Sequence, residues 1–320
     1  MKDKIIIGID GGATKTTGVI FNHRGETLVH DSCLGSNISV DESKAANQVV
    51  ELISKMSQKI KIDLKNVSAI GIGLAGASNK NGRDRLFGIL DNLKVSDRTI
   101  ITNDIEPIYD YIWGTRQGIL LNVGTGVICI SKKDDRFIRV AGKGHDNGDI
   151  GSGYWIGREA LIELEVNNSY NQSSKELLKD FLIKNQSSSY DSLISDINES
   201  ENKIADIASF AKSVIFSAEK GNEFSRSIVQ HATRVIAEYI IEVRDIMNYG
   251  DNDIMIAGNG SVLRNNYFRQ ELNNALCFDF NEVSWIFLDI SPAYTPGLLS
   301  ARLKSINIDR KSLNKNPVKV

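Results

Sequence analysis

The sequence has few of the features that mark a metal-cluster or nucleic-acid-binding protein. Its three cysteines, Cys33, Cys129 and Cys277, lie far apart and outside any CxxC or CxxH pair. This spacing argues against an iron–sulfur cluster or a structural zinc and favours a reducing compartment. The 38 basic and 40 acidic residues give a net charge of −2, so we expect no binding to nucleic acid or to an anionic membrane.

Long apolar runs are also lacking. The segment MKDKIIIGIDGG enters a short apolar run that ends in an acid and two glycines, whereas a signal peptide has a longer apolar core and a cleavage site. No stretch approaches the ~18 apolar residues of a membrane span, so we expect a cytoplasmic protein. A chain of 320 residues that is 41% hydrophobic and 24% charged is typical of a soluble globular protein with two domains.

What the sequence does contain is an alternation of strand-like and helix-like segments, which predicts an α/β fold. We predict strands at 4–10, 16–22, 27–33, 68–73, 98–103, 253–257 and 285–288, and helices at 41–60, 80–93, 151–166, 204–219, 222–248, from about 262, and at 293–304. The polar segments SSKELL and NQSSSYD are predicted to be surface loops. From residue 119, ILLNVGTGVICISK repeats the layout of IIIGIDGGATKTTGVIF, which suggests duplicated domains that face each other.

The turn DGGATKT, after the first strand, has the composition of a phosphate loop. Its glycines let the backbone approach an anion, and its amide, hydroxyl and ammonium groups can bind phosphate oxygens. The residues expected to do so are Gly11, Gly12, Thr14, Lys15 and Thr16. It is not a Walker A loop, because Thr14 holds the place of the glycine before the lysine. Asp10 can hold Mg²⁺ through water. The alternative is a plain β-hairpin turn, for which Asp-Gly is a common signal.

Two further glycine turns are candidates for nucleotide binding. The matching turn of the repeat contains Gly124, Thr125 and Gly126, and with the first turn it favours a grip on a triphosphate from both domains. The other turn follows strand 253–257 and can bind a nucleotide base, ribose or α-phosphate. Its members are Gly258, Asn259, Gly260 and Ser261. Each turn taken alone can be purely structural, with Ser261 as a helix cap.

The segment GIGLAG, from Gly71 to Gly76, spells a dinucleotide-binding motif but lacks its context. Such a site also has an acidic residue about 20 positions further on, and Ser96 stands there. We interpret these glycines as places where the backbone approaches another ligand.

Asp104 is the candidate acid–base residue. It follows strand 98–103, and a carboxylate at the carboxyl end of a strand can accept a proton from a bound hydroxyl. The alternative is an N-cap of the next helix. In the glycine-rich stretch 142–153, His145 is interpreted as a loop residue rather than a catalytic one, and Trp155 as a core residue rather than a sugar platform.

Together these segments resemble the actin-like sugar kinase superfamily, specifically its N-acetylglucosamine kinase branch and the related BadF/BadG-type ATPases. The matching segments occur in the family's order between residue 5 and about 265: IGIDGGATKT, GLAGA, TNDIEPIY, NVGTG, GDIGSGYWIGREAL and IAGNGSVL. The resemblance implies two ribonuclease H-like (actin-like ATPase) domains with a cleft between them, which we place near 1–114 and 115–320.

The resemblance also implies roles for single residues. Asp104 matches the general base, Ala218 falls where the family lines the nucleotide pocket, and Gly258 to Ser261 lie on the adenosine side. The residues implied in sugar binding are Asn37, Gly76, Asp104, Gly144, His145 and Asp149. We expect sugar to close the cleft, with Asn37 and Asp149 on opposite sides of it.

The chain departs from the family pattern near the sugar's 2-substituent. Ile150 replaces the glutamate of the family's GDEGS, and Lys143 replaces a tryptophan. Val127 and Ile128 follow the second turn, where mammalian-type members have polar residues. These departures leave the identity of the hexosamine open. The isolated cysteines argue against the cluster-holding dehydratase activators of the BadF/BadG group.

The implied activity is transfer of the γ-phosphoryl group of ATP, with Mg²⁺, to the 6-hydroxyl of an amino sugar. N-acetylglucosamine is the first expectation, with glucosamine, N-acetylmuramic acid and N-acetylmannosamine as alternatives. Domain closure would exclude water from this reaction. A non-catalytic sugar or nucleotide sensor of the same fold is the rival, against which Asp10, Asp104 and the paired turns argue. The expected partners are ATP and a small sugar, and a homodimer stays open.

Overall fold

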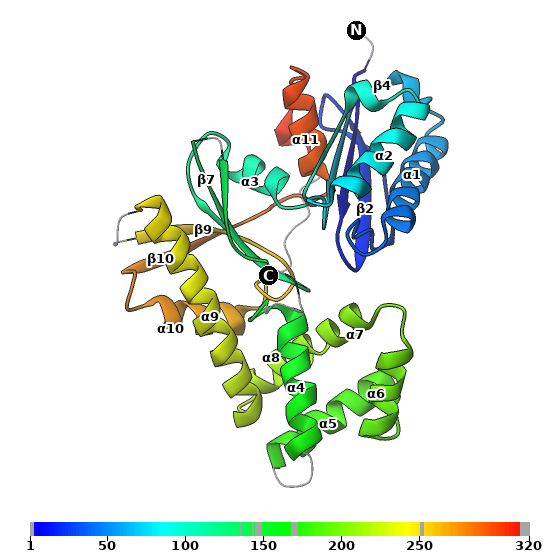
Figure 1. Ribbon diagram of the computed structural model, residues 1–320. Helices are drawn as coiled ribbons and strands as arrows, with labels where there is room; N and C mark the ends of the chain where they lie inside the picture. The colour runs from blue at the N-terminus through cyan, green and yellow to red at the C-terminus, as the bar shows by residue number, and fades with distance from the viewer. Residues whose placement is uncertain are drawn as a thin grey trace. The chain divides into compact units, whose positions relative to one another are not determined.

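The computed structural model describes residues 3–134, 136–142, 144, 149–167, 172–249 and 253–313. The chain divides into two compact units, of which unit 1 comprises Met1–Arg116 and Leu288–Lys319 and unit 2 comprises Gln117–Phe287. Each unit contains a five-stranded sheet with helices packed on it (Figure 1).

The helices and strands follow the chain in the order expected for a duplicated α/β fold. Those of unit 1 are β1 (Ile5–Gly11), β2 (Lys15–Asn22), β3 (Thr27–Leu34), α1 (Glu42–Lys59), β4 (Val67–Leu74), α2 (Lys80–Asn92), β5 (Thr99–Thr102), α3 (Glu106–Trp113) and α11 (Tyr294–Leu303), with the 3-10 turns η1 (Leu64–Asn66), η2 (Ser96–Arg98) and η4 (Arg310–Ser312). Those of unit 2 are β6 (Ile119–Val123), β7 (Val127–Lys133), β8 (Arg136–Ala141), α4 (Gly153–Asn167), α5 (Gln172–Asn185), α6 (Tyr190–Glu199), α7 (Lys203–Ser209), α8 (Ala211–Glu219), α9 (Glu223–Met247), β9 (Asp253–Asn259), α10 (Asn266–Leu276) and β10 (Glu282–Phe287).

The two sheets have the same topology. Sheet 1 has the strand order β3-β2-β1-β4-β5, and sheet 2, read in the same sense, has the order β8-β7-β6-β9-β10. In each sheet the first three strands of the unit form an antiparallel meander, and the last two run parallel to the first. The predicted α/β fold and its duplication from residue 119 are therefore confirmed. Because β1, β4 and β5 are parallel, their carboxyl ends meet at one edge of sheet 1.

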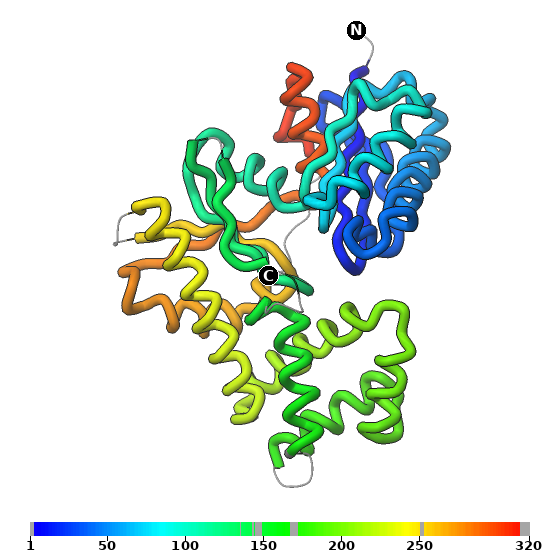
Figure 2. Tube along the Cα trace, in the orientation of Figure 1, coloured from blue at the N-terminus to red at the C-terminus, as the bar shows by residue number. Residues whose placement is uncertain are grey.

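Sheet 1 is covered on both faces. Ile7 and Ile9 are fully buried in the core that α1 and α2 form on one face. Gly8 points to the opposite face, where α11 packs against β1 and β4. A Cβ atom on Gly8 would lie 2.1 Å from the carbonyl oxygen of Ala293, so this helix lies directly on the strand backbone. Figures 1 and 2 show α11, in red, beside the blue strands of this unit.

This packing explains the glycines of the segment GIGLAG. A Cβ atom on Gly71 would lie 1.8 Å from the carbonyl oxygen of Pro296, and one on Gly73 would lie 3.2 Å from the Pro296 ring. The absence of side chains at Gly71 and Gly73 thus allows α11 to pack on β4. The prediction that these glycines approach a ligand is wrong for Gly71, which faces Pro296. The helix predicted at 293–304 is confirmed, but it packs in unit 1, although it lies within the range 115–320 expected for the second domain.

Three predictions of local structure in unit 2 are wrong. SSKELL lies within α5, where Leu177 and Phe181, four residues apart, turn into the core. SSKELL is therefore not a loop. In NQSSSYD, residues 186–189 form the connection between α5 and α6 as predicted, and only the ends of this segment lie in the two helices. The helix predicted at 204–219 is two helices that break at Phe210, and the one predicted from about 262 begins at Asn266. Among the described residues, no helix has the length and apolar character needed to cross a membrane.

Candidate functional site

The first phosphate loop is the tight turn between β1 and β2. Gly11 pairs with Thr16 across the hairpin, and the Gly12 amide donates to the Lys15 carbonyl at 2.9 Å. Thr14 and Lys15 are exposed, so their side chains are available to a phosphate group. Thr16 is fully buried instead, and its hydroxyl donates to Ser36 Oγ at 2.7 Å. Its hydroxyl is therefore engaged within the protein rather than at the exposed tip of the loop.

The predicted sugar residues of unit 1 lie in the loops beside this turn. Asn37 Oδ1 accepts a hydrogen bond from the Ser39 amide at 3.0 Å. Gly76 follows β4 with a φ of +76°, and a Cβ atom there would lie 2.4 Å from Asn37 Oδ1. Only a glycine allows this approach, because the positive φ and the close oxygen both disfavour a side chain. The structure thus brings Asn37 and Gly76 together.

Asp10 and Asp104 lie at the carboxyl edge of the same sheet. Asp10 at the end of β1 pairs with Gly73 of β4, and Gly73 pairs with Thr102 of β5. Asp104 follows two residues later, with its Cα atom 3.3 Å from the position of a Cβ on Gly73. Glycine between the two carboxylates leaves no side chain to separate them.

The electrostatics of Asp10 reflect this arrangement. Loss of water around its carboxylate, and secondly the charge of Asp104, raise the pKa of Asp10 from 3.8 to about 7. Two carboxylates that share a poorly hydrated place resist carrying full charge together. A cation or a bound proton is the compensation that such a pair favours.

The capping role considered for Asp104 is filled by its neighbour. The amides of Ile105 and Glu106 both donate to Asn103 Oδ1, at 3.0 and 2.8 Å. The first free amides of the segment that leads into α3 are therefore satisfied by an amide side chain. Sequence reasoning did not assign this role to Asn103, although Asn is as good a cap as Asp.

The second phosphate loop joins β6 to β7 and is held by the start of α4. The Gly124 amide donates to the Gly126 carbonyl at 2.9 Å. The amide of Gly153 donates to the Gly124 carbonyl at 2.7 Å, and that of Tyr154 to the Thr125 carbonyl at 3.1 Å. The end of the glycine-rich stretch 142–153 thus packs on this turn.

Asp149 lies against the same turn. A Cβ atom on Gly126 would lie 3.0 Å from Asp149 Oδ2, and Asp149 Oδ1 accepts from the Gly144 amide at 3.1 Å. The structure therefore brings Asp149 and Gly144 together next to the second phosphate loop. His145 and Lys143 lie outside the described residues.

The turn after β9 is joined to the second phosphate loop. Asn259 Nδ2 donates to Asn122 Oδ1 at 2.8 Å, and the Val262 amide donates to the Val123 carbonyl at 3.1 Å. Gly260 has a φ of +93°, and a Cβ there would lie 2.2 Å from the Val123 carbonyl oxygen. Asn122 belongs to the segment NVGTG of the second turn, but its hydrogen bond to Asn259 was not predicted from the sequence.

The other residues predicted on the adenosine side differ in their surroundings. A Cβ on Gly258 would lie 2.5 Å from the Phe287 ring, so this glycine serves packing within the sheet. Ser261 is exposed, and the cap of α10 is Asn265, whose Oδ1 accepts from the Phe268 amide at 3.0 Å. Ala218 is fully buried in the core of unit 2.

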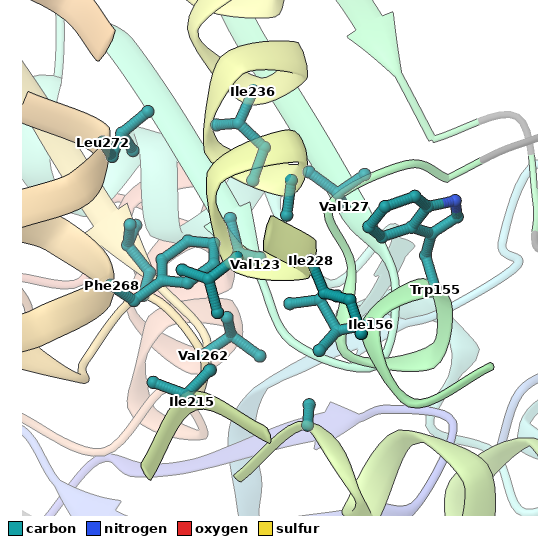
Figure 3. Close-up of a cluster of buried hydrophobic side chains, with 14 of the residues drawn as sticks. Val123, Val127, Trp155, Ile156, Ile215, Ile228, Ile236, Val262, Phe268 and Leu272 are labelled. Atoms are coloured by element: carbon teal, nitrogen blue, oxygen red, sulfur yellow. The ribbon is translucent and has the colours of Figure 1, made fainter. Parts of the chain in front are cut away.

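That core also contains Trp155. Figure 3 shows Trp155 and Ile156 of α4 beside Val127 of β7 and Ile236 of α9. The Trp155 ring meets His231 edge to face, with 5.0 Å between ring centres. Its side chain is 7% exposed, which confirms the interpretation as a core residue.

Asp10 and Asp104 could provide one or two carboxylate ligands to a cation whose other ligands are water and phosphate oxygens. Within the described part of the chain, no group of three or more His, Cys, Asp or Glu side chains is arranged to hold a metal. Mg²⁺ in nucleotide enzymes is usually bound by one or two carboxylates, with water and phosphate oxygens as the other ligands. A partly buried carboxylate with a raised pKa beside a phosphate loop fits this pattern.

Two duplicated α/β units, each with a glycine turn after its first strand, define a nucleotide-binding protein of the actin-like ATPase type. Residues 7–298 match the BadF/BadG/BcrA/BcrD ATPase family, and the chain belongs to that family. The resemblance inferred from the sequence segments is thereby confirmed.

Two named kinases are similar to this chain over most of its length. An N-acetylmuramic acid/N-acetylglucosamine kinase from Clostridium acetobutylicum is 30% identical over 295 residues, which span 91% of this chain and 96% of the relative. An N-acetyl-D-glucosamine kinase from Dictyostelium discoideum is 28% identical over 260 residues, 76% of this chain and 80% of the relative. The crystal structure of a candidate N-acetylglucosamine kinase from Chromobacterium violaceum matches 93% of this chain and 99% of its own, with a TM-score of 0.74 at 18% identity. The similarity to this crystal structure is a similarity of fold alone.

Proposed function

We propose that this protein is an ATP-dependent amino-sugar kinase that phosphorylates the 6-hydroxyl of N-acetylglucosamine. The observation that carries the proposal is the pair of Asp10 and Asp104 at the carboxyl edge of sheet 1, beside a phosphate loop and the Asn37–Gly76 contact. The names of the two relatives favour an amino sugar as the acceptor. Because one of them also acts on N-acetylmuramic acid, that sugar is the second candidate substrate.

In the proposed reaction each group has one task. Asp104 accepts the proton of the sugar hydroxyl while the oxygen of that hydroxyl forms a bond to the γ-phosphorus of ATP. The bond from this phosphorus to the oxygen that bridges it to the β-phosphate breaks, and ADP leaves. Asn37 and Asp149 hold sugar hydroxyls. Thr14, Lys15 and the two glycine turns bind the phosphates. Asp10 would hold Mg²⁺ through water, and the ion supplies charge neutralisation on the phosphates when bound.

The proposal is tested by phosphoryl transfer across a panel of sugars. The purified protein is incubated with ATP, Mg²⁺ and one of N-acetylglucosamine, N-acetylmuramic acid, glucosamine, N-acetylmannosamine or glucose, and ADP and sugar phosphate are measured separately. We expect the highest kcat/KM with N-acetylglucosamine and phosphate on the 6-oxygen by ³¹P and ¹³C NMR. If ATP and sugar bind but no sugar phosphate forms, the protein is the non-catalytic sensor.

The first phosphate loop gives a prediction about the nucleotide. A Cβ atom on Gly12 meets only the Lys15 carbonyl oxygen, at 3.4 Å, so Gly12→Val should fold while placing a branched side chain where phosphate must approach. We expect the KM for ATP to rise about tenfold or more, the equivalent of at least about 1.4 kcal/mol, with the KM for sugar changed by less than about twofold.

Gly88 of α2 provides a matched control, because a Cβ there has no neighbour within 4 Å. Gly88→Val should leave both KM values near those of the wild type. Equal increases in the two KM values of a folded Gly12→Val protein would contradict the placement of phosphate at this turn.

A further inference from the structure

A pair of buried hydroxyls lies behind the first phosphate loop. Thr16 Oγ1 donates to Ser36 Oγ at 2.7 Å, and both residues are fully buried. Thr16 ends the loop at the start of β2, and Ser36 directly precedes Asn37, the residue proposed to bind sugar. Both residues are buried away from water, so removal of one hydroxyl deprives the other of this hydrogen bond, and water does not replace it.

The backbone around this pair connects the phosphate loop to the sugar loops in a closed circuit. The Ser36 amide donates to the Gly12 carbonyl at 3.1 Å, and the Ile38 amide donates to the Ala75 carbonyl at 3.1 Å. The Ala75 amide in turn donates to the Gly11 carbonyl at 2.7 Å. One end of the circuit is the phosphate loop, and the other carries Asn37 and Gly76.

The loops of the circuit are closely packed against one another. A Cβ atom on Gly11 would lie 2.3 Å from Ser36 Oγ, and one on Gly35 would lie 2.1 Å from the Ala13 carbonyl oxygen. Ser36 is thus enclosed between Gly11 and Thr16, and its hydroxyl fills the space that Gly11 leaves. We therefore expect a substitution of Ser36 to affect both the phosphate loop and the loops that carry Asn37 and Gly76.

We propose that Ser36 is a positioning residue that holds the phosphate loop and Asn37 in one common geometry, so that nucleotide and sugar affinity depend on the same hydroxyl pair. In this view Thr16 anchors the loop through Ser36, while Thr14 and Lys15 make the phosphate contacts. The inference rests on the proposed function, because it takes ATP and an amino sugar as the ligands of the two loops.

The test combines Ser36→Ala, Thr16→Val, the double variant and Thr16→Ser. Affinities for a non-hydrolysable ATP analogue and for N-acetylglucosamine are measured separately by calorimetry, and steady-state kinetics give both KM values and kcat. We expect Ser36→Ala and Thr16→Val each to weaken binding of the analogue about tenfold and of the sugar about threefold or more. The double variant should lose no more than either single one. Thr16→Ser, which keeps the hydroxyl, should stay within about twofold of the wild type.

Ser57 provides the matched control for loss of a buried hydroxyl. It is 3% exposed on α1 of the same unit, and its Oγ donates to the Ile53 carbonyl at 2.8 Å. Ser57→Ala should lower Tm and leave both affinities unchanged, since it lies outside the circuit.

Several results would overturn the proposal. These are additive losses in the double variant, unchanged affinities in Ser36→Ala, losses in Ser57→Ala equal to those in Ser36→Ala, or a loss of ATP affinity with sugar affinity intact. A wild-type protein that binds the analogue and sugar but transfers no phosphoryl group would contradict the proposed function alone, because the calorimetric comparison still reads the role of Ser36. A wild-type protein that binds no analogue would contradict both.

Discussion

Asp104→Asn is expected to lower kcat for sugar phosphorylation by about 10²–10⁴-fold, the usual loss when a general base is removed. The substitution keeps the size of the side chain but replaces a proton acceptor with an amide. Since Asn103 supplies the side-chain oxygen that the Ile105 and Glu106 amides use, the start of α3 should remain intact. Removal of the Asp104 charge also removes one of the two causes of the raised pKa of Asp10, so binding of ATP with Mg²⁺ should be retained.

The measurement is kcat under saturating ATP and sugar, together with Tm and the affinity for an ATP analogue. Asp84→Asn is the control, because Asp84 is an exposed carboxylate on α2 of the same unit. It should match the wild type in all three quantities. An Asp104→Asn protein that keeps more than about a tenth of the wild-type kcat would remove Asp104 from the role of general base.

The duplicated sheets could be predicted from the sequence because their signals are local. A short apolar strand, a glycine turn and a second strand can be recognised within a few residues, and the same layout recurs from residue 119. The position of α11 could not be predicted in this way. Its apolar residues do not show which sheet it covers, whereas contacts in the structure, such as that of Pro296 with Gly71, show that the chain returns to unit 1.

The helices α5 and α6 were missed for a different reason. Serine and asparagine are frequent in loops and at helix caps, and Ser189 is in fact the cap of α6. The buried stripe of α5 is narrow, with Leu177 and Phe181 among polar residues, and its helix is stabilised by packing such as that of Phe181 on Phe210. Tertiary packing of this kind overrides the local preference of the segment.

In the candidate site, the residue types were predictable but the directions of the side chains were not. Thr16 fits a phosphate contact by composition, yet burial turns its hydroxyl toward Ser36. Asp149 was assigned to the sugar, and it lies next to Gly126 of the second phosphate loop. Direction follows from strand register and from neighbours distant in sequence, which a single sequence does not contain.

Asp10→Asn is expected to impair catalysis while making the protein more stable at alkaline pH. Burial and the charge of Asp104 raise the pKa of Asp10 from 3.8 to about 7. Between these two values the folded protein keeps a proton that the unfolded chain has released. The stability that this proton provides is therefore fully present below about pH 4 and is lost as the pH rises through about 7.

The size of the effect follows from the shift. A change from 3.8 to about 7 corresponds to at most about 4 kcal/mol in the free energy of unfolding, reduced by the water that reaches a partly exposed carboxylate. Asparagine carries no charge at pH 5 or at pH 8. The Tm of Asp10→Asn should thus exceed that of the wild type by several degrees at pH 8 and by much less at pH 5.

Asp31 provides a control of opposite sign. Hydrogen bonds from Lys59 and Lys55 hold the pKa of Asp31 well below its usual range, and the Lys59 contact is 2.7 Å long. Its stabilising effect is present above the unfolded pKa and is lost as the pH falls, so Asp31→Asn should lower Tm at pH 8 and lose this effect in acid.

The effect of Mg²⁺ on Tm tests whether the Asp10 carboxylate lies next to the bound cation. A cation beside the carboxylate favours its charged form, so millimolar Mg²⁺ should raise the Tm of the wild type at pH 8 and leave that of Asp10→Asn unchanged. In activity assays the variant should lose about 10–100-fold in kcat/KM for ATP, as expected when a group that orients the metal shell is removed. A Tm difference that is the same at pH 5 and pH 8, or a Mg²⁺ response that persists in the variant, would contradict this account. Burial disfavours the charged form of Asp10 in the free protein. The same burial therefore favours binding of the cation that accompanies ATP, because the cation stabilises that charged form.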